Sequence, residues 1–426
     1  MSGIIIFSIL LVLMLTGMPV SISLGLTVLS FIFLFTQVPI EAVALKLFTG
    51  IEKFEIMAIP FFILAGNFLT HGGVARRMIN FATSMVGHWH GGLGLGAVVA
   101  CALFAAVSGS SPATVAAIGA ILLPAMVKAG FPKKFGAGVI TTSGGLGILI
   151  PPSIVMVMYS VTTNTSVGAL FMAGVIPGAM LATLLGLTTW WIARRNNYPR
   201  LPKASWGQRL KALKDSIWGL MLIVIVMGGI YSGMFTPTEA AAMSAVYAFI
   251  VAVFVYKDLS IKDVPRMLLN SANMSAMLLY IITNAVLFSF VLANENVPQQ
   301  LADWLINMGL GPIAFLLVVN ILLLIAGNFM EPSSIILILA PILFPVAVQL
   351  GIDPIHFGIL IVVNMEIGLC TPPVGLNLYV ASGIAKMGMT EITKAVSPWL
   401  LTMLAFLGLV TYVPEISLWL PRMLGY

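Results

Sequence analysis

Four short interruptions of apolar segments carry the residues of this sequence that could bind ions or a small ligand. Two are rich in polar residues: Ser-Gly-Ser-Ser-Pro-Ala-Thr at 108–114 and Asn-Phe-Met-Glu-Pro-Ser-Ser at 328–334. The other two combine glycine with a proline pair, and they lie at 143–153 and 368–377. Hydroxyl and backbone carbonyl oxygens suit a hard cation such as Na⁺, whereas amides at the start of a helix suit an anion. The four interruptions therefore predict sites for a cation and an anionic ligand.

The interruption at 143–153 lies inside an apolar run, 135–163, that is long enough to cross a membrane. Proline removes a backbone donor and clashes with the preceding turn, and glycine has the largest entropic cost in a helix. Freed backbone groups in lipid must find partners, so a broken helix is tolerated where it is buried in protein or lines a wet cavity. This segment is therefore predicted to contribute to such a cavity.

The same pattern occurs a second time, 221 residues later. Gly368, Pro372 and Pro373 correspond there to Gly147, Pro151 and Pro152. The same offset, without a gap, also pairs Pro124 with Pro345, Gly130 with Gly351 and Pro177 with Pro398. Such agreement predicts an internal repeat. Paired hydrophobic segments interrupted by Gly and Pro indicate the binding site of a secondary transporter.

Composition places these motifs in a lipid bilayer. The chain is 60% hydrophobic and 8% charged, and its mean hydropathy is +1.09, whereas soluble domains carry about 25% charged residues. We predict an all-α polytopic membrane protein. The net charge of +6 does not indicate nucleic-acid binding, because no basic stripe with interleaved aromatic residues is present. Cys101 and Cys370 lie in apolar segments without metal-ligand spacing, so neither a disulfide nor a metal site is expected from them.

The repeat divides the chain into two predicted halves, 1–200 and 201–426, each with about five spans and one re-entrant hairpin. The hairpins are predicted at 97–128 and 312–350, and the broken helices at 135–163 and 355–382. The loop at 194–214 carries seven basic residues and no acid, which places it in the cytoplasm. An odd number of spans per half inverts the second repeat and leaves both termini extracytoplasmic.

The candidate ligands are the polar and glycine residues of the four interruptions. In the first half they are Ser108, Ser110, Ser111, Thr114, Gly144, Gly145 and Gly147, and in the second Glu331, Ser333, Ser334, Gly368, Thr371, Val374 and Asn377. Helix packing is the alternative role for any single hydroxyl. Glu331 and Glu366 are acids within apolar spans, where an acid is a functional candidate, although Glu366 could be a hydrogen-bonded packing residue. Asn67, Asn328 and Asn364 are interpreted as interhelical hydrogen-bonding residues.

The motifs at 108–114, 147–153 and 368–377 resemble those of the large membrane subunit of tripartite ATP-independent periplasmic (TRAP) transporters, and the resemblance covers essentially the whole chain. It implies an elevator-type ion-transporter fold, in which the hairpins and broken helices form a transport domain that moves against a scaffold of the other spans. It also implies Na⁺-driven uptake of an organic acid across the bacterial inner membrane. The implied partners are a small four-helix membrane subunit, expected as a separate chain, and a periplasmic substrate-binding protein.

The resemblance also divides the candidate residues, because the family's Na⁺ sites lie between each hairpin tip and its broken helix. The expected Na⁺ ligands are Ser108, Ser110, Thr114, Gly144, Gly145, Gly147, Ser334, Gly368, Thr371 and Val374. The expected substrate-binding residues are Ser111, Pro112, Pro152, Ser153, Glu331, Ser333, Pro373 and Asn377. Sialic acid and C4-dicarboxylates are the expected substrates, with a slight preference for sialic acid.

Three other functions stay open at this point. A self-sufficient anion:Na⁺ symporter would have a related architecture and need no binding protein. An ion channel would pass ions far faster than a carrier. A membrane enzyme is disfavoured, because no catalytic constellation is visible and no organic cofactor is indicated.

Overall fold

The computed structural model describes residues 2–36, 38–307 and 311–425. Within these ranges the chain forms helices and turns without any β-strand, which confirms the predicted all-α fold. Nine helical segments of the described part are long and apolar enough to cross a membrane. The chain is therefore a multi-pass membrane protein.

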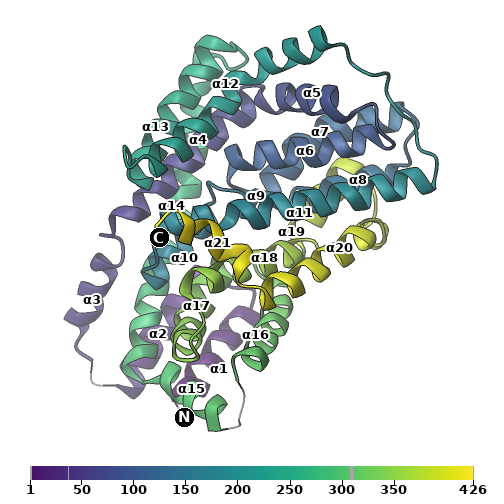
Figure 1. The fold of residues 1–426 in the computed structure, drawn as a ribbon. Coiled ribbons are helices and arrows are strands. Elements are labelled where there is room, and N and C mark those ends of the chain that lie inside the picture. Colours follow the sequence, from purple (N-terminus) through teal and green to yellow (C-terminus); the bar gives the residue numbers. More distant parts are fainter. Residues whose placement is uncertain (1, 37, 308–310, 426) are drawn as a thin grey trace.

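One order of helices occurs in both halves of the chain. Three apolar helices open each half: α1 (Ser2–Leu15), α2 (Val20–Phe35) and α4 (Ala58–His71) in the first, and α12 (Trp206–Tyr231), α13 (Pro237–Ile250) and α14 (Val264–Asn294) in the second. Helix α2 packs against α14, and α4 packs against α13. Figure 1 shows α4, α12 and α13 together along one flank. Equivalent helices of the two halves thus exchange partners, as expected of a repeat.

A pair of helices joined by a short break follows at each predicted hairpin. The pairs are α6 (Gly92–Ser108) with α7 (Ser111–Lys128), and α16 (Pro312–Gly327) with α17 (Pro332–Gln349). Helix α6 begins five residues before the predicted position 97. Gly109 joins α6 to α7 with a φ of 60°, a left-handed conformation that glycine adopts without steric cost. Gly130 and Gly351, which the repeat pairs, also have positive φ, and each follows the second helix of its pair.

The predicted broken helices lie next in each half. The first consists of α8 (Lys133–Ser143), α9 (Leu146–Leu149) and α10 (Ile154–Thr163), and the second of α18 (Pro354–Leu369) and α19 (Leu376–Ala385). Both Pro-Pro peptide bonds, at 151–152 and 372–373, are cis. Helix α10 packs against α17, and α19 packs against α7. A long span closes each half, α11 (Val167–Arg195) and α20 (Met389–Tyr412).

Four shorter helices accompany the spans: α3 (Ile40–Thr49), α5 (Val74–Val86), α15 (Val297–Asn307) and α21 (Glu415–Met423). Single helical turns lie at Phe54–Met57, Val251–Val255 and Ile261–Asp263. The predicted loop at 194–214 needs correction, because α12 already begins at Trp206. A capping box causes this early start: the Gln208 amide donates to Ser205 Oγ (3.2 Å), and the Ser205 amide donates to Gln208 Oε1 (2.8 Å).

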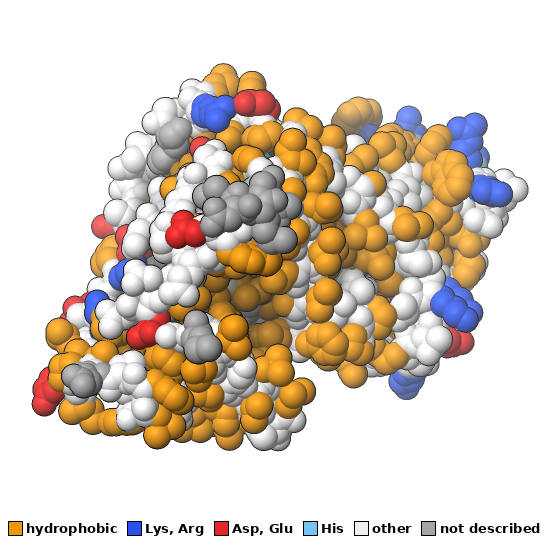
Figure 2. Space-filling view, turned by 90° about the horizontal axis from the view of Figure 1, so that it is seen from below, with side chains coloured by type: hydrophobic (Ala, Val, Ile, Leu, Met, Phe, Trp, Pro, Cys, Tyr) orange, Lys and Arg blue, Asp and Glu red, His pale blue; other side chains and the backbone are white. Residues whose placement is uncertain are grey.

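The molecular surface is apolar over the spans. Figure 2 shows apolar side chains over most of one face, with charged side chains toward its ends. Ile4 and Leu401, for example, are 74% and 68% exposed. Such exposure is expected where lipid is the solvent, whereas a soluble monomer rarely exposes large apolar patches.

Candidate functional site

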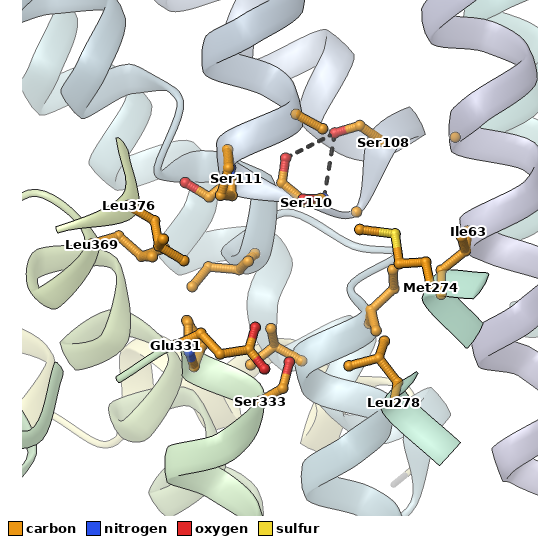
Figure 3. A pocket seen from close by; sticks show the side chains of 18 of the residues that line it. Ile63, Ser108, Ser110, Ser111, Met274, Leu278, Glu331, Ser333, Leu369 and Leu376 are labelled. Atoms are coloured by element: carbon orange, nitrogen blue, oxygen red, sulfur yellow. Dashed lines mark hydrogen bonds between the residues drawn. The ribbon is translucent and has the colours of Figure 1, made fainter. Parts of the chain in front are cut away.

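A cavity of about 470 Å³ lies where the two helix pairs and the two broken helices meet. Ser108, Ser110 and Pro112 line it from the first pair, and Glu331 and Ser333 line it from the second. Figure 3 shows Ser108, Ser110 and Ser111 on one wall, with Glu331 and Ser333 facing them across the cavity. The two polar interruptions, which lie more than 200 residues apart in the sequence, therefore form opposite walls of one site.

Four helices begin at this cavity. Its lining includes the first residues of α7, α10, α17 and α19, among them Ser111, Ile154, Pro332 and Leu376. The first turn of a helix presents amides without intrahelical partners and a partial positive charge. In the described chain, α7, α17 and α19 have no side-chain cap on these amides, while Ser153 caps α10. The breaks in the helices thus direct donors toward the cavity.

No lysine, arginine or histidine occurs among the described residues that line the cavity. Its only charged side chain in that part of the chain is Glu331, whose Oε1 accepts a hydrogen bond from Ser334 Oγ (3.4 Å). An anion in the cavity would therefore be held by amides and hydroxyls. Glu331 would require a nearby cation or its own proton to tolerate that anion.

Helices α4 and α14 form a wall that the sequence did not predict. Ile63 and Asn67 of α4 line the cavity together with Met274, Met277 and Leu278 of α14. Asn67 Nδ2 donates to Ser271 Oγ of α14 (2.7 Å), so its predicted interhelical role is confirmed. Little in the sequence indicated that Asn67 would face the cavity, because an isolated polar residue in a span is usually a packing contact.

The expected Na⁺ ligands of the first half form a compact cluster of oxygens. Ser108 Oγ lies 2.8 Å from Thr114 Oγ1 and donates to the Ser110 carbonyl (3.2 Å), which also accepts from Thr114 Oγ1 (2.9 Å). Gly147 passes so close that a Cβ there would lie 2.7 Å from the Ser110 carbonyl oxygen. This approach brings the backbone of α9 against the oxygen cluster. Gly144 contacts Val115 of α7, whereas Gly145 faces Met403 and Glu366 instead.

The second half repeats this close approach between a tip and a break. A Cβ at Gly368 would lie 2.8 Å from Gly327 Cα, and the Val374 amide donates to the Asn328 carbonyl (3.0 Å). Thr371 Oγ1 donates to the Ile367 carbonyl (2.6 Å). Asn328 Oδ1 is buried without a hydrogen-bond partner among the described residues. An unpaired buried oxygen is costly, and a cation at this position would satisfy it.

Four of the expected substrate-binding residues do not line the cavity. Asn377 is fully buried behind it, where its Nδ2 donates to Ser111 Oγ (2.7 Å). Ser153 Oγ accepts from the Met156 amide (3.4 Å) as the cap of α10. The Pro152 carbonyl packs against Gly109, and Pro373 is exposed. These four residues therefore belong to the breaks in the helices and not to the lining of the cavity.

Glu366 lies on α18, the first part of the second broken helix. It is fully buried, and neither carboxylate oxygen has a hydrogen-bond partner among the described residues. Its Cβ lies 3.7 Å from the position that a Cβ on Gly145 would take. The hydrogen-bonded packing role considered for Glu366 is therefore not what the structure shows.

Sequence comparison identifies the family. The family described as "Tripartite ATP-independent periplasmic transporter, DctM component" matches residues 7–416. The chain belongs to this family. The predicted resemblance to the large TRAP membrane subunit is thereby confirmed.

Several curated relatives match over nearly their whole length. The chain is 74% identical to the C4-dicarboxylate TRAP transporter large permease protein DctM of Rhodobacter capsulatus, with 100% of both chains covered. It is 55% identical to the protein of the same name from Pseudomonas aeruginosa, over 95% of this chain and 94% of the relative. It is 38% identical to the sialic acid TRAP transporter large permease protein SiaM of Vibrio cholerae, with 97% of both chains covered.

A solved structure shows the same fold at low identity. The YdaH transporter of Alcanivorax borkumensis, described as having an unusual topology, superposes with a TM-score of 0.65 at 15% identity, over 91% of this chain and 90% of that one. The architecture of this TRAP large permease is thus shared with another transporter.

Proposed function

We propose that this TRAP large permease carries a C4-dicarboxylate across the bacterial inner membrane, driven by a Na⁺ gradient. The observation that supports this most strongly is the convergence of four helix starts on a cavity without a basic residue in the described lining. The starts of α7 and α17 lie on opposite walls, so a substrate with a carboxylate at each end could bind both. The relatives at 74% and 55% identity are named for C4-dicarboxylates, which favours these over sialic acid.

Na⁺ coupling is supported by the two places where a tip meets its break. At each one, glycines let the backbones approach within a distance that a Cβ would prevent. The hydroxyl and carbonyl oxygens gathered there are of the kind that a hard cation such as Na⁺ prefers. A cation bound beside Glu331 and Ser334 would also lower the repulsion between Glu331 and an anionic substrate. In this proposal, Na⁺ and the dicarboxylate favour each other's binding.

The proposed moving parts are those of the predicted division. We propose that the hairpins and broken helices form a transport domain, and that the spans that include α4 and α14 form a scaffold. The inverted orientation of the two repeats would make one tip accessible from each side of the membrane. We also propose that a separate small membrane subunit and a periplasmic binding protein complete the transporter, which the word "tripartite" in the family description supports.

Uptake of labelled succinate and labelled sialic acid into proteoliposomes tests the proposed function. The vesicles would contain this chain with its small subunit and binding protein, or this chain alone, with or without external Na⁺. We expect succinate uptake only with all three parts and Na⁺. Uptake by the chain alone would indicate a self-sufficient symporter, and sialic acid uptake would overturn the proposed substrate. A flux linear in concentration at channel-like rates would overturn the carrier mechanism.

A further inference from the structure

A second cavity, of about 430 Å³, lies between α6 and α11, away from the substrate cavity. The α6 wall comprises Leu95, Val98, Val99, Ala102 and Leu103, and the α11 wall comprises Ala182, Thr183, Gly186, Leu187 and Trp190. These positions recur at helical spacing, so each wall is one face of its helix. Thr183 is the only hydroxyl in the described lining, and its Oγ1 already donates to the Ala179 carbonyl (2.7 Å). The groove is therefore apolar.

The dimensions of the groove match one leaflet of a bilayer. Eight residues separate Leu95 from Leu103 and also Ala182 from Trp190, which corresponds to a length of about 12 Å at 1.5 Å per residue. Half of a hydrocarbon core is about 15 Å thick. Leu187 and Trp89, at the outer edge, are 55% and 53% exposed. An acyl chain of one leaflet would fit along the groove.

Positive charge lies at the end of the groove that Trp89 and Trp190 line. The Arg194 guanidinium lies 5.1 Å above the Trp190 ring, one turn beyond the last residue of the α11 wall. Trp89 also lines the groove, and Arg200 contacts the next residue, His90. Arg195 lies 5.5 Å above the Trp191 ring. The stretch from 194 to 214 contains no acid that would neutralise these arginines.

From this arrangement we infer that the α6–α11 groove binds an anionic phospholipid, with one acyl chain in the groove and the phosphate at Arg194. Tryptophan rings at the level of the headgroups and arginines beside a phosphate are the groups that recognise such a lipid. The groove joins the first helix of a hairpin to a long span, so a bound lipid would hold these two helices together.

Gly186 provides the sharpest variant for a test. Within 4 Å, a Cβ at Gly186 would meet only Leu95 Cδ2, at 3.9 Å, so a side chain at position 186 has room to extend into the groove. Gly408 on α20 is the matched control, because a Cβ there would meet nothing within 4 Å. The test is native mass spectrometry of the full chain, released from nanodiscs with equal parts of phosphatidylglycerol and phosphatidylcholine.

We expect the wild type and Gly408→Phe to retain phosphatidylglycerol, and Gly186→Phe to lose it. Arg194→Gln should lower the preference for phosphatidylglycerol over phosphatidylcholine about fivefold, because each basic residue near an anionic surface contributes about that factor. This surface variant keeps the test valid if Gly186→Phe misfolds. Equal retention in Gly186→Phe and Gly408→Phe, or an unchanged preference in Arg194→Gln, would overturn the inference. Loss of the lipid when the small subunit binds, with a photocrosslink from position 187 to that subunit, would show a protein occupant instead.

Discussion

At the scale of single residues, the site depends on acids and glycines whose neighbours are now defined. Glu331 is the only charged side chain among the described residues that line the cavity. It faces Ser110 and Ser111 across the space where the substrate would lie. Ser334 lies within hydrogen-bond distance of its carboxylate. Glu331 is therefore the residue through which a cation and an anionic substrate would influence each other most directly.

Replacing Glu331 with glutamine tests this role. We expect Glu331→Gln to raise the Na⁺ concentration for half-maximal succinate uptake at least about tenfold, a loss of about 1.4 kcal/mol, because the variant removes a negative charge beside the cation. Glu415→Gln is the control, because Glu415 is exposed and pairs with Arg422 at the surface. Unchanged Na⁺ dependence in Glu331→Gln, measured in the three-part proteoliposomes, would contradict the proposed coupling.

The two repeated glycines permit a second prediction. A Cβ at position 147 would lie 2.7 Å from the Ser110 carbonyl oxygen, and one at position 368 would lie 2.8 Å from Gly327 Cα. Both neighbours are backbone atoms, so a tip would have to move away from its break. Overpacking of this kind costs about 1–3 kcal/mol, and we expect Gly147→Ala and Gly368→Ala each to lower uptake at least about fivefold.

Gly383→Ala is the matched control for these substitutions, since a Cβ at position 383 would meet nothing within 4 Å. Equal uptake by all three variants, at equal expression and equal thermal stability, would refute the importance of the two close approaches.

At the scale of helices, the segment before α4 ties two groups of helices together. Lys53 Nζ donates to the Val161 carbonyl and to Asn164 Oδ1, both at 2.6 Å, at the end of α10. The next residue, Phe54, accepts a hydrogen bond from Thr238 Oγ1 of α13 (3.0 Å). If α10 moves with the transport domain and α13 stays with the scaffold, the contacts of Lys53 must break in each cycle.

A reversible disulfide tests this motion in a background with Cys101→Ala and Cys370→Ala. We expect oxidation of the pair Lys53→Cys and Asn164→Cys to stop uptake, and reduction to restore it. The control pair, Thr188→Cys and Thr402→Cys, joins α11 to α20, where the two native hydroxyls are 2.8 Å apart. We expect its oxidation to leave uptake unchanged. Full activity of the oxidised 53–164 pair would rule out relative motion at this contact.

The sequence predicted the interrupted helices well, because glycine and proline in an apolar span leave a clear local signal. The same offset that pairs the prolines also pairs Gly130 with Gly351, and both have positive φ in the structure. The α4 and α14 wall was not predicted. Ile63 and Met274 are ordinary apolar residues in apolar helices, and hydropathy does not show which face of such a helix lines a cavity.

The position of Asn377 behind the cavity could not be predicted from the sequence either. Its amide in the second break suggested a ligand, but the packing of α19 against α7 places it behind Ser111. Contacts between the halves, which decide whether a polar group faces a cavity or another side chain, are absent from a single sequence.

At the scale of the whole molecule, the proposed topology places the two repeats in opposite orientations. The basic stretch 194–214 would lie in the cytoplasm, and the end of the chain would lie outside. In the cysteine-free background, Lys203→Cys should react with a membrane-impermeant thiol reagent only in inside-out vesicles. Glu415→Cys should react only in right-side-out vesicles. Labelling of both positions from the same side would contradict the inverted repeat.

The central claim is that a dicarboxylate binds between the helix starts of α7 and α17 without a basic side chain. The most direct test is a structure of the three-part transporter with bromosuccinate and Na⁺, in which bromine marks the ligand. We predict ligand density in the 470 Å³ cavity, with its carboxylates at the first turns of α7 and α17 beside Ser111 and Ser333. Ligand density at another site, with this cavity empty, would contradict the account.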